Sequence, residues 1–153
     1  MKYREISVWL HTIARWFCGA VFLYASFDKL GEAQRFLDIV KEYHVLPHAL
    51  EPLAAVVIPW LEALVGFALL IGFRWRGAAL VYCGLLVGYS LGLSINLVRG
   101  VDMVCGCFSM DDLDKVTYRT VLRDLALMAP GIWVLLGNGT KSALDDFLHG
   151  NRE

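Results

Sequence analysis

Charged residues are scarce in this 153-residue chain: Asp, Glu, Lys and Arg together make up 19% of it, and they cluster rather than spread. The formal net charge is −1, so there is no electrostatic reason to expect a nucleic-acid partner. The sequence also lacks a glycine-rich loop that could cradle a phosphate, and it lacks any low-complexity tract. These absences give no support to a function in binding nucleotides or nucleic acids.

Hydrophobic residues take the place of charge. They make up 58% of the chain, whereas soluble domains have about 45–50%. About 20 apolar residues are needed to cross the roughly 30 Å hydrocarbon layer of a membrane. Four segments are long enough, at about residues 7–30, 51–73, 77–98 and 118–136. We therefore expect an all-α integral membrane protein, a four-helix bundle forming one domain over residues 1–153. The first segment is too long for the apolar part of a signal peptide, so we expect it to span the membrane.

The stretch between the first two spans has a different pattern. Over residues 31–46, apolar side chains such as Phe36 and Ile39 alternate with charged ones at roughly helical spacing, and Pro47 follows. About 16 residues with this much charge cannot cross a membrane. The pattern predicts an amphipathic helix that lies at the interface or caps the bundle.

Glycines recur every four residues in the third span, at Gly84, Gly88 and Gly92. This spacing is typical of a face on which a neighbouring helix approaches closely. We expect a packing role for it.

Four spans place both termini on one side of the membrane, together with the short basic turn Arg74-Trp75-Arg76. By bare count, Lys and Arg are nearly balanced between the two sides. The short turn and the charged N-terminus favour cytoplasmic termini in a bacterial inner membrane. The loop between the last two spans then faces the periplasm or the exterior, where disulfides persist.

That loop carries the clearest chemical signal, Cys105-Gly106-Cys107-Phe108. Two cysteines one residue apart can come within the Cα separation of a disulfide, about 4.4–6.8 Å, and Gly106 allows the bend. A disulfide that closes such a small ring removes little entropy from the unfolded chain, so it would add little stability. It is better suited to thiol–disulfide exchange. Cys18 and Cys83, inside spans, are expected to be structural.

Ionisable and amide side chains inside a membrane are costly, and they are functional candidates by default. By topology, several should converge beneath the cysteine loop, with Glu62 deepest. One interpretation is that Lys29–Glu62 and Arg123–Asp28 are buried pairs that fix helix register. The other is that a basic side chain favours the attacking thiolate and a carboxylate relays protons. The candidates are Asp28, Lys29, Glu62, Asn96, Arg119, Arg123 and Asp124.

Two other functions fit the same residues. The thiolates could bind a soft metal such as Cu(I), with sulfur from Met103, Met110 or Met128 and imidazole from His44 or His48. Alternatively, the chain could be a scaffold on which the cysteines are incidental. The scaffold would rely on the glycine face and the amphipathic helix.

Taken together, the motifs resemble the MauE branch of the DoxX-like membrane proteins, over about residues 15–136. The resemblance rests on the end of the first span (Ala25–Leu30), on Pro59-x-x-Glu62-x-x-x-Gly66 with Gly72, on the Cys-Gly-Cys-Phe motif, and on Arg119 with Arg123. The chain departs from the family pattern at Ser109, where glycine is usual, and at Asp124, where asparagine is expected. Neither departure touches the thiols.

The resemblance implies a four-helix membrane bundle, similar in outline to vitamin K epoxide reductase-like proteins. The MauE family is linked to disulfide maturation of methylamine dehydrogenase beside a periplasmic thioredoxin-like partner. DoxX-like relatives are associated with quinone-linked oxidation of thiosulfate or sulfide.

The leading hypothesis is therefore a membrane thiol–disulfide oxidoreductase. Cys105 and Cys107 exchange with a periplasmic thioredoxin-fold partner, and electrons pass to or from membrane quinone. We expect Cys107 to attack, because it lies nearer to Arg119. We expect no metal cofactor and no nucleic acid, and we leave homo-oligomerisation open.

Overall fold

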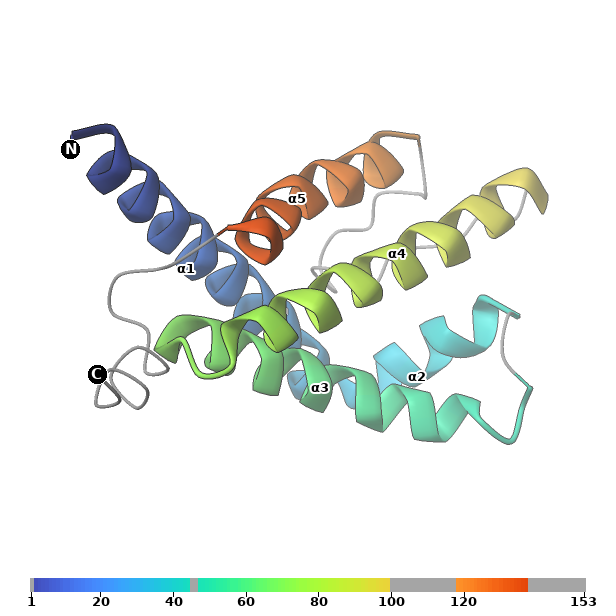
Figure 1. The fold of residues 1–153 in the computed structure, drawn as a ribbon. Helices are drawn as coiled ribbons and strands as arrows, with labels where there is room; N and C mark the ends of the chain where they lie inside the picture. Colours follow the sequence, from blue (N-terminus) through green and yellow to red (C-terminus); the bar gives the residue numbers. More distant parts are fainter. Residues whose placement is uncertain (1, 45–46, 100–117, 138–153) are drawn as a thin grey trace.

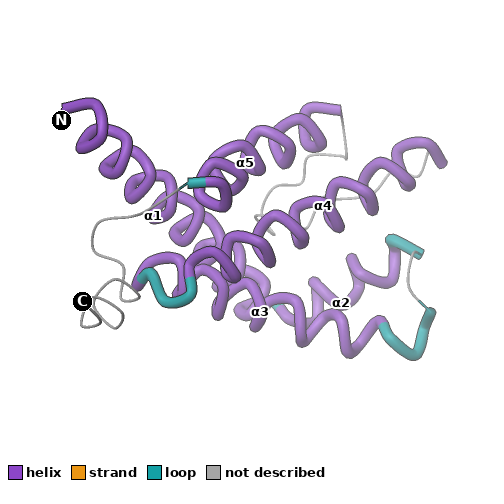
Figure 2. The backbone as a smooth tube through the Cα atoms, viewed as in Figure 1, coloured by secondary structure: helices purple, strands orange, loops and turns teal. Residues whose placement is uncertain are grey.

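The computed structural model describes residues 2–44, 47–99 and 118–137, and all regular structure in them is helical (Figures 1 and 2). This confirms the all-α class. Cys105, Cys107 and the rest of their loop lie outside the described residues. The helices are α1 (Lys2–Gly31), α2 (Ala33–Glu42), α3 (Glu51–Ile71), α4 (Trp75–Arg99) and α5 (Tyr118–Leu136).

Three of these helices are long and apolar enough to cross a membrane: α1 over Ile6–Gly31, α3 and α4. Their lengths follow from uninterrupted apolar runs. The helix α5 has 19 residues, and Arg119, Arg123 and Asp124 lie in its first two turns. Its crossing of the membrane therefore stays a prediction.

The four long helices form a closed ring of contacts, in which α1 packs on α3 and α5, and α4 packs on the same two helices. The tightest approach is between α1 and α3. A methyl group added at Gly19 would lie 2.9 Å from the carbonyl oxygen of Gly66, and one added at Gly66 would lie 2.9 Å from that of Gly19. Two glycines, one on each helix, therefore let the backbones approach closely.

The glycine face predicted on α4 does not make such a contact within the described part of the chain. Methyl groups added at Gly84 or Gly88 would meet no described atom within 4 Å. At Gly92 the neighbour is the ring of Tyr43, at 3.2 Å, rather than another backbone. The prediction of close helix packing along this spacing is therefore wrong for the described part of the chain.

Apolar side chains fill the interior of the ring, and others cover its outside. Phe22 of α1 and Tyr82 of α4 meet in the centre, with ring centroids 4.3 Å apart. Cys18 is buried beside them, as predicted, and Cys83 is half-buried at the edge of this core. Many large apolar residues point outward, among them Phe27, Leu64 and Leu122. An apolar exterior of this extent suits a lipid environment.

The amphipathic helix forms as predicted and packs on α3. Its apolar face buries Phe36 and Ile39 against Ala55. Its exposed polar face carries two ion pairs between residues three apart, Glu32–Arg35 and Asp38–Lys41, at 2.9 Å and 3.0 Å. Figure 1 shows α2 at the same end of the molecule as the last turn of α4 and the first turn of α5.

Candidate functional site

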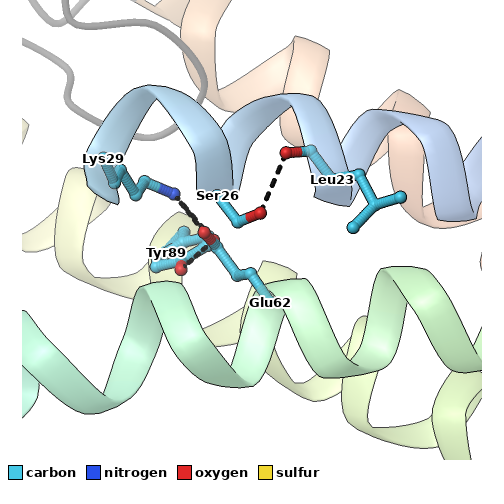
Figure 3. A network of polar contacts seen from close by, with 5 residues as sticks. All are labelled: Leu23, Ser26, Lys29, Glu62 and Tyr89. Carbon is cyan, nitrogen blue, oxygen red and sulfur yellow. Dashed lines mark hydrogen bonds and ion pairs between the residues drawn. The ribbon is translucent and has the colours of Figure 1, made fainter. Parts of the chain in front are cut away.

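A buried ion pair joins α1 to α3. Lys29 Nζ donates hydrogen bonds to both carboxylate oxygens of Glu62, at 2.7 Å and 2.8 Å (Figure 3). Each side chain is only 1% exposed. This pairing was one of the two predicted from the sequence, and the structure confirms it. Because both charges have left water, losing either partner would strand the other in an apolar interior.

Tyr89 of α4 is the third member of this site, and the sequence analysis missed it. Its hydroxyl donates to Oε1 of Glu62, and its ring centroid lies 5.0 Å from Lys29 Nζ. Phe36 of α2 adds a second ring, 5.6 Å from the same ammonium. Four helices therefore contribute to one cluster. The available signal was spacing, because Tyr89 lies seven residues before Asn96 and so shares a helix face with it.

Local packing explains why the pair can form. Gly66 lies one turn beyond Glu62 on α3, and its contact with Gly19 holds α1 and α3 close together. The hydroxyl of Ser26 turns back to its own helix and donates to the carbonyl of Leu23 at 2.9 Å (Figure 3). The carboxylate of Glu62 is thus held by Lys29 and Tyr89, from two other helices.

Asp124 of α5 is a second buried carboxylate, with a side-chain exposure of 0%. Its nearest ionic contact is its neighbour, with Arg123 Nε 3.5 Å from Oδ1. Neither oxygen accepts a hydrogen bond from the part of the chain that the structure describes. The predicted pairing of Arg123 with Asp28 stays a prediction. Asp28 is half-buried, and Arg119 is exposed.

Asn96 is fully buried but serves another purpose. Its amide donates to the carbonyl of Gly92 at 3.0 Å and to that of Tyr43, at the end of α2, at 3.2 Å. It therefore ties the amphipathic helix to α4 rather than joining the Lys29 cluster.

The two histidines considered as metal ligands have separate local partners. His48 Nδ1 lies 3.0 Å from Glu51 Oε1, and His44 Nδ1 lies 2.8 Å from the carbonyl oxygen of Glu42. Within residues 2–44, 47–99 and 118–137, no three His, Cys, Asp or Glu side chains gather as metal ligands would. The metal alternative therefore depends on the cysteine loop itself.

Comparisons with known proteins agree on one family. The family model described as "Methylamine utilisation protein MauE" matches residues 7–137. Proteins of that name match from Paracoccus denitrificans (32% identical over 124 residues, 80% of this chain and 67% of the relative), from Methylorubrum extorquens (31% over 128 residues, 81% and 69%) and from Methylophilus methylotrophus (32% over 120 residues, 77% and 63%). No solved structure matches the chain.

The chain spans about two thirds of the length of these relatives. The match covers every helix described above, including both sides of the Lys29–Glu62 pair. Together with three apolar helices of membrane-spanning length, it identifies a multi-pass bacterial membrane protein. The chain belongs to the MauE family.

Proposed function

We propose that this protein is a membrane thiol–disulfide oxidoreductase. In this proposal Cys105 and Cys107 exchange with a thioredoxin-fold partner on the periplasmic side, and membrane quinone is the second redox partner. The observation that supports it best is the Lys29–Glu62–Tyr89 cluster, a fully buried ion pair with a hydroxyl donor. Such a cluster is costly in a membrane, so function is its default explanation.

The location of the cluster adds support. It lies between the last turns of α1 and the middle of α3, and α2 covers it with Phe36. The helix α4 ends at Arg99 and α5 begins at Tyr118, at the end of the molecule that also holds α2 (Figure 1). In the sequence, the two cysteines lie between these two helix ends.

The proposed chemistry balances in two steps. In the first, the thiols of Cys105 and Cys107 reduce the disulfide of the partner, and a Cys105–Cys107 disulfide forms while the partner gains two thiols. In the second, the Cys105–Cys107 disulfide takes up two electrons and two protons and returns to two thiols; a membrane quinol would supply both, leaving quinone. Both steps are reversible, so the relative potentials of partner and quinone set the direction.

The cluster would serve both steps. When Glu62 takes up a proton, the ammonium group of Lys29 is no longer neutralised, and its positive charge favours a thiolate. Glu62 supplies a carboxylate that can accept and return a proton, and Tyr89 holds that carboxylate in place. The quinone, when bound, supplies the two-electron chemistry.

A second candidate function is a scaffold for the maturation of a partner enzyme. It is favoured by the printed names of the relatives, which refer to methylamine utilisation and to no reaction. In that case the two cysteines would be dispensable.

The test compares Cys105→Ala, Cys107→Ala and the double variant with wild type in cells that need this protein for growth on methylamine. We expect each variant to lose growth while the protein stays at normal level in the membrane. Full growth of the double variant would contradict the oxidoreductase proposal and favour the scaffold. Wild-type thiols that react only after a chelator is added would point to metal instead.

A further inference from the structure

A second group of polar side chains lies at the other end of the long helices, around Trp75 at the start of α4. His11 of α1 meets the ring of Trp75 edge-on, with centroids 5.3 Å apart, and the guanidinium of Arg76 lies 5.1 Å from the same ring. Arg74 precedes Trp75 in the turn, and Arg15 lies one helical turn from His11 and is fully buried. We call these residues the basic end.

Two of these side chains donate hydrogen bonds to carbonyl groups at the end of α5. His11 Nε2 donates to the carbonyl of Val134 at 2.9 Å, and Arg76 Nη2 donates to the carbonyl of Gly137 at 3.2 Å. The last carbonyl groups of a helix lack partners within it and carry about half a negative charge. Half a negative charge does not balance the guanidinium groups of Arg74 and Arg76, so among the described residues this end keeps an excess of positive charge.

The two exposed arginines, Arg74 and Arg76, carry that excess. Among the residues that the structure describes, no Asp or Glu forms an ion pair with either of them. The contrast with α2 is direct, because Arg35 and Lys41 there each have an acidic partner three residues away. Arg76 uses one of its five N–H donors on Gly137, which leaves the others for an outside acceptor.

The backbone at Arg74 supports the same interpretation. Its φ is +42°, in the left-handed region, which a residue with a side chain adopts less readily than glycine. The backbone there would favour glycine, and the sequence instead has a cation at this position, beside the start of α4.

Large apolar side chains are exposed near these arginines, either close to them along the chain or at the end of α5, beside the carbonyl that Arg76 contacts. Phe73 lies beside Arg74, Leu80 lies one turn beyond Arg76, and Trp133 and Leu136 lie in the last turn of α5. Two arginines beside an apolar surface suit an anionic lipid, because its phosphate can pair with the arginines while its acyl chains contact the apolar side chains. A free phosphate ion would contact only the two arginines.

We propose that the basic end binds the headgroup phosphate of an anionic phospholipid through Arg74 and Arg76, with its acyl chains against the neighbouring apolar side chains. Each arginine near an anionic lipid surface contributes about 1 kcal/mol, so two together correspond to about a 30-fold change in affinity. This proposal does not depend on the thiol chemistry.

The test uses the full chain, purified and stripped of lipid, and measures lipid affinity by native mass spectrometry. The probes are phosphatidylglycerol, phosphatidylcholine with the same acyl chains, and inorganic phosphate. We expect preferential binding of phosphatidylglycerol that weakens about 30-fold in the double variant Arg74→Gln/Arg76→Gln. The variant Arg74→Lys/Arg76→Lys should keep most of the affinity.

The matched control is Arg35→Gln/Lys41→Gln, which removes the same charge from exposed positions on α2 and should leave affinity nearly unchanged. An equal loss in this control would show an effect of net charge alone and would overturn the proposal. Equal binding of phosphatidylcholine, competition by inorganic phosphate at similar concentration, or full affinity of Arg74→Gln/Arg76→Gln would also overturn it.

Discussion

The two ends of the long helices hold their buried polar side chains in different ways. Lys29 meets a full negative charge, because both oxygens of Glu62 accept its hydrogen bonds. About 27 Å away along α1, at 1.5 Å per residue, His11 donates to the carbonyl of Val134 and meets the ring of Trp75 edge-on. The first arrangement is neutral and closed, whereas the second leaves positive charge at the surface. This difference suggests internal chemistry at one end and attraction of an outside anion at the other.

The comparison predicts the largest stability effect at Glu62. Glu62→Gln removes the negative charge and leaves the ammonium of Lys29 buried without it, which should lower the free energy of unfolding by about 3–5 kcal/mol. Reversible unfolding in mixed detergent micelles measures this. The double variant Lys29→Met/Glu62→Met should recover most of the loss, because a buried ion pair and well-packed apolar side chains are often of similar stability.

The control for this prediction is Glu32→Gln, which breaks an ion pair on the exposed face of α2. Such surface pairs contribute less than about 1 kcal/mol. A loss at Glu62 no larger than that at Glu32 would show that the buried pair is solvated or unimportant, and the contrast between the two ends would disappear.

The next effect concerns the close approach that positions the pair. Gly66→Ala places a methyl group 2.9 Å from the carbonyl oxygen of Gly19, and overpacking of this kind costs about 1–3 kcal/mol. Gly84→Ala meets no described atom and should be neutral or stabilising by up to about 1 kcal/mol, since alanine favours helix. In thermal unfolding, we expect Gly66→Ala to lower the melting temperature and Gly84→Ala to leave it unchanged or raise it. Equal losses would mean that an additional helix or protein packs against Gly84.

Tyr89 allows a matched comparison with Tyr82, one heptad earlier on the same helix. Tyr89→Phe removes a hydrogen bond to a charged group, which contributes about 1.5–3 kcal/mol, whereas Tyr82→Phe removes one to the carbonyl of Leu127, which contributes about 0.5–1.5 kcal/mol. Unfolding measurements should rank them in that order. If Tyr89 positions Glu62 for proton transfer, Tyr89→Phe should also slow electron exchange between the thiols and quinone, whereas Tyr82→Phe should not.

The smallest effect is expected at the basic end. His11→Phe keeps an aromatic ring against Trp75 but removes the donor to Val134, which should cost about 1 kcal/mol. The measurement is the same unfolding transition. A loss as large as that of Glu62→Gln would indicate that both ends store comparable energy.

The sequence predicted the helices well, because the length of an apolar run fixes the length of a membrane helix. The segment predicted at residues 51–73 is observed as Glu51–Ile71, and the amphipathic stretch predicted over 31–46 forms a helix over Ala33–Glu42. It also predicted the Lys29–Glu62 pair, since opposite charges inside a membrane have strong reason to meet.

The sequence did not reveal which helices approach closely. Glycine spacing along one helix shows where an approach is possible, but it does not say whether a second helix comes there. Gly19 and Gly66 lie on different helices, and their contact follows from the whole arrangement. Tyr89 was missed for a related reason, because a tyrosine in an apolar helix usually packs, and its hydroxyl partner is known only once α3 and α4 are side by side.

The most direct test of the oxidoreductase proposal is a redox titration of Cys105 and Cys107 in native membranes. Thiol trapping in defined redox buffers, with and without added quinone, would report their state, and Cys18→Ser/Cys83→Ser protein would isolate the pair. The proposal predicts a reversible two-electron couple that shifts toward the disulfide when quinone is added. Thiols that stay reduced at every potential, whether or not quinone is present, would contradict it.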